Sequence, residues 1–382
     1  MKQEQLGLDF DLADLPLVTP PSRPVRKPRA AKALPRVAPT VASTSPPNDA
    51  SCPDAASPVL LSASSVGEPP WTAEAMAMAL EKHPDYRVLR RLVPCLRFEH
   101  QPLGPVCTLL ILDTETTGLD ATRDRVIELA LLRVSVDTAT GLPVGEVQVY
   151  DGLEDPGRPI PSAITDITGI TDAMVQGQRL DEARVAELMA GVDLVVAHNA
   201  GFDRPFVEAR LPAFGALAWA CSWADLDWKA WGQGSAKLES LALACGWFYD
   251  AHRAETDCHA LLAVLARPVS AFGQVAQDGD GCTGLSLLLK AASDTHHRLQ
   301  ATGAPFEAKD ALKARGYRWD AQQRVWGMTL RSESALNEEL AWLADAVYGG
   351  HATRVRVEAL DARQRYSSRA GVTAMRLVGN SP

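Results

Sequence analysis

The sequence lacks the features that mark several classes of protein. None of its apolar runs approaches the roughly 18 residues that a membrane-spanning helix needs. Its first residues, MKQEQLGLDFDLADL, lack the basic start and the apolar core of a secretion signal. Its seven cysteines include no Cys-x-x-Cys pair, which argues against a disulfide framework and against a structural zinc site. Together these absences predict a cytoplasmic protein with reduced thiols.

Basic residues are outnumbered by acidic ones. The chain carries 38 Lys and Arg against 47 Asp and Glu, a formal net charge of −9, which argues against a surface coated in basic patches. Nucleic acid is still allowed as a substrate, because a cluster of carboxylates becomes locally positive once it has bound divalent cations. The length of 382 residues predicts one main core with a smaller module or a tail.

The N-terminal part has little periodic pattern. From Leu15 to about Pro70 it is rich in Pro, Ala, Ser, Thr and Val, so residues 1–70 are predicted to be a disordered tail. Within it, the acid-free run SRPVRKPRAAKALPR could contact phosphates without sequence preference. The alternative is that this run only solvates the chain.

An apolar peptide, QLGLDF at residues 5–10, stands near the start of that tail, ahead of its Pro- and Ala-rich part. It resembles the short peptide by which bacterial replication and repair proteins dock on the sliding clamp, with Gln5, Leu8 and Phe10 in the anchor positions. Its place at the chain end, ahead of a flexible linker, favours this interpretation. The alternative is that Leu6, Leu8 and Phe10 pack on the protein's own surface.

Periodic patterns begin near Trp71. Residues 71–104 predict a helical lead-in of one or two helices. Residues 105–270 predict an α/β domain, because three strands with short connections form an antiparallel meander and two more strands alternate with helices. The expected architecture is a mixed five-stranded sheet flanked by helices.

The pattern changes in the last part of the chain. Residues 275–382 predict a small α+β module of unknown role, with a helix over 284–303 and an aromatic hairpin that places Tyr317 and Trp319 on one face. Its mixture of basic and aromatic residues is also found on surfaces that bind single-stranded nucleic acid. The alternative is that Tyr317, Trp319 and Trp326 fill the core of a small domain.

Two acids end an apolar strand in the stretch LLILDTETTGLD, residues 109–120. Residues two apart in a strand point to the same face, so Asp113 and Glu115 project together while Thr114 points away. Adjacent carboxylates disfavour joint ionisation unless cations neutralise them. Oxygen donors without histidine or thiolate suit Mg²⁺ or Mn²⁺ better than zinc, so the pair predicts half of a metal site.

Two later stretches supply further candidates. VDLVVAHNAGFDRPF places Asp203 at the start of a helix that follows an apolar strand. HRAETDCHALL places Asp257 in the first turn of the domain's last helix and His252 in the loop before it. Histidine as a residue type has a pKa of about 6.5, which suits a general base at neutral pH, and a loop position gives the side chain reach.

The motifs LDTETTGL, HNAGFD and HRAETD, in this order within one α/β pattern, resemble the DEDD 3′→5′ exonucleases of the histidine subtype. This is the family of the epsilon proofreading subunit of bacterial DNA polymerase III. The resemblance covers about Cys107 to Arg267 and implies a ribonuclease H-like fold. It also implies removal of nucleoside 5′-monophosphates from DNA 3′ ends in replication, proofreading or repair. One departure is Thr168, where many members have histidine, and it lies outside the catalytic set.

The expected roles of individual residues follow from this resemblance. Two Mg²⁺ or Mn²⁺ ions would be bound by the four acids, and His252 would take a proton from the attacking water. A pocket for the terminal nucleotide is implied at the same strand end. The metal ligands would be Asp113, Glu115, Asp203 and Asp257, and the substrate-binding residues would be Thr116, Thr117, Leu119, Asn199 and Phe202.

Some of these assignments have alternatives. Thr117 could shape a turn, and Phe202 could fill the core, without either of them binding substrate. RNA ends are an alternative substrate to single-stranded or frayed DNA ends. An inactive nucleic-acid-binding module is a third hypothesis, but the presence of all four acids and the histidine argues against it. Glu128 is predicted to be a strand acid with a local partner, and Cys258 is predicted to have no catalytic role.

Overall fold

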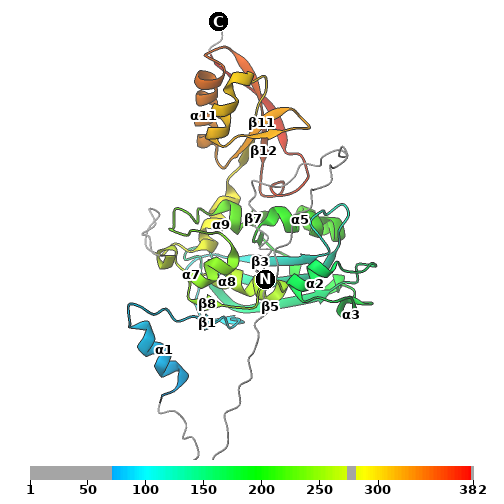
Figure 1. The fold of residues 1–382 in the computed structure, drawn as a ribbon, viewed down its shortest axis with the longest axis vertical. Helices are drawn as coiled ribbons and strands as arrows, with labels where there is room; N and C mark the ends of the chain where they lie inside the picture. The colour runs from blue at the N-terminus through cyan, green and yellow to red at the C-terminus, as the bar shows by residue number, and fades with distance from the viewer. Residues whose placement is uncertain (1–70, 273–280, 380–382) are drawn as a thin grey trace, which may run out of the picture. The chain divides into compact units, whose positions relative to one another are not determined.

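A computed structural model describes residues 71–272 and 281–379 (Figure 1). The predicted tail and the candidate clamp-binding peptide at residues 5–10 therefore lie outside the described part. The chain divides into two compact units, Met1–Lys82 and His83–Pro382. Among the helices that are described, none is long and apolar enough to cross a bilayer.

The first unit contains helix α1 (Ala73–Glu81). Thr72 caps its N-terminus, because the Thr72 Oγ1 accepts a 3.1 Å hydrogen bond from the backbone N–H of Ala75. Leu80 is 40% exposed and no residue of this helix is buried, so packing within its own unit contributes little to holding α1 together.

Short strands replace the second half of the helical lead-in predicted over residues 71–104. In the second unit β1 (Arg90–Arg91) pairs with β8 (Trp247–Phe248), and β2 (Arg97–Phe98) pairs with β5. Strands of two residues leave no alternation in the sequence, and their partners lie far along the chain. A local pattern therefore could not reveal them.

The central sheet of the second unit has six strands in the order β2-β5-β4-β3-β6-β7. The predicted mixed sheet flanked by helices is confirmed, but the predicted number of five strands is wrong because the short edge strand β2 adds a sixth. β3, β4 and β5 are antiparallel, while β6 and β7 run parallel to β3. The longer strands are β3 (Val106–Thr116), β4 (Val126–Asp137), β5 (Pro143–Leu153), β6 (Leu194–Ala197) and β7 (Trp219–Cys221).

Alternation along β3 divides the core into two layers. Leu109 and Ile111 belong to the apolar cluster that includes α8 (Ala254–Leu265), whereas Leu110 and Leu112 belong to the cluster that includes α5 (Ala200–Arg210). All four side chains are fully buried, and each such side chain contributes about 1.5–3 kcal/mol to stability. Continued alternation directs the acids that follow these residues toward the α8 side of the sheet.

Shorter helices fill the connections of the central sheet. Asp181 caps α4, because its Oδ1 accepts a 3.0 Å hydrogen bond from the backbone N–H of Arg184. The remaining helices of this region are α2 (Ser162–Thr168), α3 (Asp172–Val175), α4 (Glu182–Met189), η1 (Pro212–Ala216), α6 (Ser222–Asp225), α7 (Leu238–Ala244) and η2 (Val269–Phe272).

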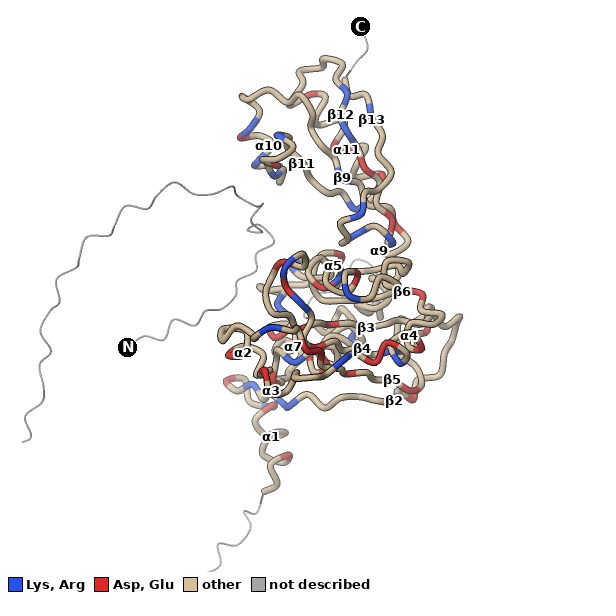
Figure 2. The backbone as a smooth tube through the Cα atoms, turned by 90° about the vertical axis from the view of Figure 1, so that its right-hand side faces the viewer, with Lys and Arg blue, Asp and Glu red and all other residues tan. Residues whose placement is uncertain are grey.

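The C-terminal module is built on a second sheet, with five strands in the order β10-β11-β9-β12-β13. Its core includes Leu299, Leu312, Leu336 and Val355. Figure 2 shows basic and acidic positions interspersed along the backbone of the second unit. The elements are α9 (Gly284–Ser293), β9 (His296–Ala301), η3 (Phe306–Ala308), α10 (Lys309–Arg315), β10 (Arg318–Asp320), β11 (Val325–Leu330), α11 (Glu333–Trp342), η4 (Leu343–Val347), β12 (Thr353–Leu360) and β13 (Val372–Val378).

Two details of this module differ from the prediction. The single helix predicted over residues 284–303 is instead a helix followed by β9, a strand that pairs on both sides, with β11 and β12. Those pairings override the local helical pattern. Tyr317 is buried and stacks on Trp342, while Trp319 is 46% exposed beside Trp326, so Tyr317 and Trp319 do not share one face.

Candidate active site

Three carboxylates meet where β3 ends. Asp113 and Glu115 come from the last residues of β3, and Asp257 comes from the first turn of α8. Each offers a carboxylate oxygen, and these oxygens all lie within 4.8 Å of one another. The structure therefore brings together three of the four acids that the sequence selected, on the α8 side of the sheet as the strand alternation requires.

The surroundings of this group disfavour negative charge. Burial, together with the charges of Asp203 and Asp257, raises the pKa of Asp113 well above its usual range. Burial and the charges of Asp257 and Glu128 raise the pKa of Glu115 to about 8. Burial also raises the pKa of Asp257 to about 6. A divalent cation would remove this repulsion, so the oxygen donors fit a hard metal ion such as Mg²⁺ or Mn²⁺.

Asp203, the fourth acid, comes from α5, which packs on the face of the central sheet opposite to α8. It is 2% exposed, and its Oδ1 accepts a 2.8 Å hydrogen bond from the hydroxyl of Thr114. Burial raises the pKa of Asp203 to about 7, although the Thr114 bond acts in the opposite direction. Asp203 lies outside the group of oxygens within 4.8 Å, and its charge nevertheless raises the pKa of Asp113. Sequence reasoning missed Thr114, whose hydroxyl orients this acid.

His252 lies on a loop that is tied to Asp257. Its side chain is exposed, and its backbone has φ 67°, a left-handed conformation that is rare outside glycine. The backbone N–H of His252 donates a 2.8 Å hydrogen bond to Asp257 Oδ2, and the hydroxyl of Tyr249 donates one of 2.8 Å to Asp257 Oδ1. These two bonds fix the Asp257 carboxylate and the loop together. Tyr249 carries no motif signal in the sequence and was missed.

Glu128 anchors the start of α8. It is fully buried on β4, directly opposite Glu115, and its carboxylate accepts hydrogen bonds from the Arg253 guanidinium at 2.9 and 2.5 Å. The same carboxylate accepts a 2.9 Å bond from the backbone N–H of Ala254, at the N-terminus of α8. Glu128 is thus a strand acid with a local partner, as predicted, and its bonds help to place the helix turn that carries Asp257.

The predicted substrate-binding residues have different surroundings. Thr116 donates a 2.6 Å hydrogen bond to the carbonyl of Gly118, and Thr117 accepts one of 2.7 Å from Arg158. Both threonines are buried and shape the turn, which agrees with the alternative given for Thr117. The other three are Leu119, which is 57% exposed, Asn199, which has φ 71° just before α5, and Phe202, which is half-buried against Phe206.

Two other titratable side chains lie in this region, and burial explains the shifted pKa of each. His198 Nδ1 lies 2.7 Å from Ser222 Oγ, and burial lowers the pKa of this imidazole to about 4, so it is neutral at pH 7. Cys258 is fully buried, and burial raises the pKa of its thiol well above the usual range. A neutral, enclosed thiol is a poor nucleophile, in agreement with the prediction that Cys258 has no catalytic role.

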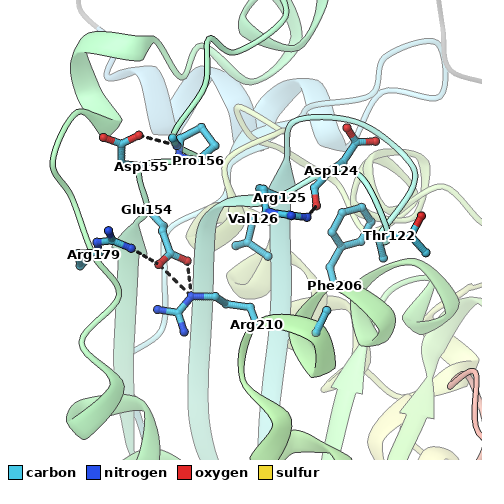
Figure 3. A pocket seen from close by; sticks show the side chains of 13 residues that line it. Thr122, Asp124, Arg125, Val126, Glu154, Asp155, Pro156, Arg179, Phe206 and Arg210 are labelled. Atoms are coloured by element: carbon cyan, nitrogen blue, oxygen red, sulfur yellow. Dashed lines mark hydrogen bonds and ion pairs between the residues drawn. The ribbon is translucent and has the colours of Figure 1, made fainter.

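A pocket of about 580 Å³ lies at the same edge of the sheet but on the α5 side (Figure 3). Phe206 and Arg210 of α5 line it, together with Glu154 after β5. The carboxylate of Glu154 accepts hydrogen bonds of 2.9 and 2.7 Å from the Nε of Arg210. None of the four candidate metal ligands lines this pocket, so the candidate active site is the partly exposed group of carboxylates and not this cavity.

Known proteins resemble part of this chain. A family model described as "Exonuclease" matches residues 110–265. DNA polymerase III PolC-type of Bacillus subtilis (strain 168) is 38% identical over 104 residues, which are 26% of this chain and 7% of that protein. A DNA polymerase III subunit epsilon-like protein of Rhodobacter capsulatus is 39% identical over 106 residues, 27% of this chain and 14% of that protein. The chain thus spans only a small part of the length of these relatives.

Two solved structures are also similar to part of this chain. A structure of Exonuclease X in complex with 5′ overhanging duplex DNA is 25% identical and covers 47% of this chain and 99% of its own, with a TM-score of 0.33. A zinc-bound E. coli ExoI complex with single-stranded DNA is 18% identical and covers 52% and 48%, with a TM-score of 0.36. The segment matched by the family contains Asp113, Glu115, Asp203, His252 and Asp257. Residues 110–265 thus form a domain of the exonuclease family.

Proposed function

We propose that the chain is a metal-dependent 3′→5′ exonuclease that removes nucleoside 5′-monophosphates from DNA 3′ ends. The observation that supports this most is the group formed by Asp113, Glu115 and Asp257, with carboxylate oxygens within 4.8 Å inside the exonuclease-family domain. The relatives named as parts of DNA polymerase III favour DNA as the substrate and replication, proofreading or repair, in the cytoplasm, as the setting.

The four acids form the proposed metal site. Asp113, Glu115 and Asp257 would hold one divalent ion, and Asp203 would join them in binding a second, with Mg²⁺ or Mn²⁺ as the ions. When bound, such ions stabilise negative charge on the phosphate and on the leaving 3′ oxygen. Without a cation, burial holds the pKa values of all four carboxyls above their ordinary range, and the charges of neighbouring acids add to this for Asp113, Glu115 and Asp203.

The chain's own residues supply the remaining roles. His252 is the proposed general base, because its side chain is exposed on a loop whose backbone N–H binds Asp257. It would take the proton of the attacking water. Leu119 is the proposed contact for the terminal base because it is 57% exposed in the turn that follows Glu115, and Asn199 and Phe202, at the start of α5, would line the same pocket. Thr116 and Thr117 would act by holding the turn, since their hydroxyls already bind protein groups.

A digestion assay tests the proposed activity. Single-stranded DNA labelled at its 5′ end should shorten progressively from the 3′ end in Mg²⁺, should stay intact in excess EDTA, and should be cleaved again after Mg²⁺ or Mn²⁺ is restored. A 5′-labelled RNA strand of the same sequence tests the alternative substrate. Faster cleavage of the RNA would assign the activity to RNA ends. Intact strands of both kinds in Mg²⁺ and in Mn²⁺ would reject the proposed function.

Binding to the sliding clamp is a separate part of the proposal. It is supported by the pattern of Gln5, Leu8 and Phe10 in the sequence. Purified clamp should retain the wild-type chain but not the double variant Gln5→Ala, Phe10→Ala. The variant Gln3→Ala, just outside the peptide, is the matched control and should bind as the wild type does. Equal retention of the double variant would reject clamp binding through this peptide.

A further inference from the structure

The loop that joins β12 to β13, residues 361–371, is held by α5 of the exonuclease-family domain. Arg204 is fully buried, and its guanidinium donates hydrogen bonds to three carbonyls of this loop. These bonds are 3.3 Å to Ala362 O, 2.6 Å to Arg363 O and 2.6 Å to Arg365 O, while the Nε donates at 2.6 Å to Glu208. Most of the hydrogen bonds that the Arg204 guanidinium donates therefore go to a loop that lies outside the family-matched residues 110–265.

Neighbouring bonds bind the same loop to β7, the edge strand of the central sheet, and to η1, the short helix just before it. The backbone N–H of Trp219 donates a 2.8 Å hydrogen bond to Ala362 O, and Arg363 Nε donates at 3.3 Å to Ala216 O. The guanidinium of Arg204 lies 5.2 Å from the ring centre of Trp219. The loop therefore contacts both α5 and β7.

The far side of the loop is held by a second buried network. Arg365 is 2% exposed, and its Nη1 lies 3.4 Å from Asp225 Oδ1 and 2.7 Å from His296 Nε2. The hydroxyl of Tyr366 also donates to Asp225 Oδ1. Asp225 lies on α6 and is buried, whereas His296 begins β9, so this network ties the C-terminal module to the central sheet through charged side chains.

Arg204 directly follows Asp203, a proposed metal ligand on the same turn of α5. If the loop moved away, the buried Arg204 guanidinium would lose three of its hydrogen-bond acceptors, which is unfavourable unless the helix turn adjusts. The 2.8 Å hydrogen bond from Thr114 holds Asp203 toward β3, and the loop carbonyls bind Arg204, the next residue of α5. Two consecutive residues of this turn of α5 are thus each bound by a contact from outside the helix.

We propose that the β12–β13 loop of the C-terminal module positions Asp203 through Arg204, and so sets the affinity of the active site for its divalent cation. This rests on the proposed function in that Asp203 is taken as a metal ligand. The C-terminal module then serves as part of the nuclease site, although it lies beyond the family-matched segment. Arg204 and Tyr366 are positioning residues, since neither touches the reacting atoms.

The test is a calorimetric titration of the full-length chain with Mn²⁺, alongside steady-state cleavage kinetics. Arg204→Gln should weaken Mn²⁺ binding about 10-fold, the lower end of the effect of groups that orient metal ligands. Tyr366→Phe removes one hydroxyl, and with it one hydrogen bond to Asp225, from the far side of the loop; it should weaken binding by about 3-fold, which is within the net contribution of a single hydrogen bond. Arg210→Gln is the control. Arg210 lies on the same helix as Arg204, but its guanidinium binds Glu154 and not the loop, so this variant should leave Mn²⁺ affinity unchanged.

The outcomes separate the two proposals. Folded Arg204→Gln protein that binds Mn²⁺ as tightly as the wild type would overturn the positioning role. If Arg204→Gln does not fold, unchanged Mn²⁺ affinity in Tyr366→Phe overturns it instead. Wild-type protein that binds Mn²⁺ but cleaves neither DNA nor RNA would reject the exonuclease function alone, and weaker binding by the variants would then still support the positioning role.

Discussion

Replacing Asp113 with Asn is expected to abolish cleavage and at the same time to stabilise the metal-free protein. Asp113 lies in the group of carboxylates within 4.8 Å, so the substitution removes a charged ligand from the proposed metal site. We expect kcat/KM to fall by roughly 10³-fold or more, because residues that act as one catalytic unit are strongly non-additive. Cleavage of 5′-labelled DNA in saturating Mg²⁺ measures this loss.

The expected gain in stability follows from the raised pKa of Asp113. A carboxyl with a folded-state pKa above its unfolded value stabilises the fold fully below the unfolded pKa, and that contribution is lost as pH rises through the folded pKa. Glu115 and Asp203, with pKa values of about 8 and 7, extend the loss across neutral pH. Metal-free wild type should therefore be less stable at pH 8 than at pH 5.

The neutral amide of the Asp113→Asn variant removes one charge from this repulsion, so the melting temperature in EDTA should rise by about 2–4 °C at pH 8 for each kcal/mol relieved. The difference from the wild type should shrink toward pH 5. Asp155→Asn is the matched control, because hydrogen bonds from Gly177 and Gly157 lower the pKa of Asp155, and its loss should destabilise the protein at pH 8. A lower melting temperature for Asp113→Asn at pH 8 would contradict the argument from repulsion.

The sequence was most informative where a regular pattern meets polar residues. The alternation of Leu109 to Leu112 predicted the strand and also the direction in which Asp113 and Glu115 point, because both follow from the same two-residue period. Asp257 was predicted from its place in the first turn of a helix, and the structure brings it to the pair. The catalytic roles of these residues remain predictions.

Long-range contacts account for most of what the sequence did not show. β9 was assigned to a helix because its identity as a strand depends on β11 and β12 on either side of it. The bonds from Arg204 to carbonyls near residue 363 depend on backbone groups, which carry no residue-type signal at all. For Glu128 the sequence indicated only an acid within a buried strand. Its partner Arg253 could not be predicted, because the two residues are 125 positions apart and meet only in the folded structure.

His252→Ala should lower kcat by about 10²–10⁴-fold while KM changes by less than about 3-fold, because loss of a general base slows the chemical step more than it weakens binding. The measurement is steady-state cleavage of single-stranded DNA at saturating Mg²⁺. Calorimetric titration with Mn²⁺ should give nearly unchanged affinity, since it is the backbone N–H of His252, retained in alanine, that binds Asp257.

The backbone of His252 calls for a second variant. At φ 67° a residue with a Cβ carries a strain of about 1 kcal/mol, whereas Asn tolerates this conformation better, so His252→Asn removes the base with less disturbance of the loop. Equal losses of kcat in His252→Ala and His252→Asn would assign the effect to the imidazole. Exposed His83 is the control, and His83→Ala should cleave at the wild-type rate. A KM that rises as much as kcat falls, or Mn²⁺ affinity lost in both His252 variants, would show instead that the loop acts by holding Asp257.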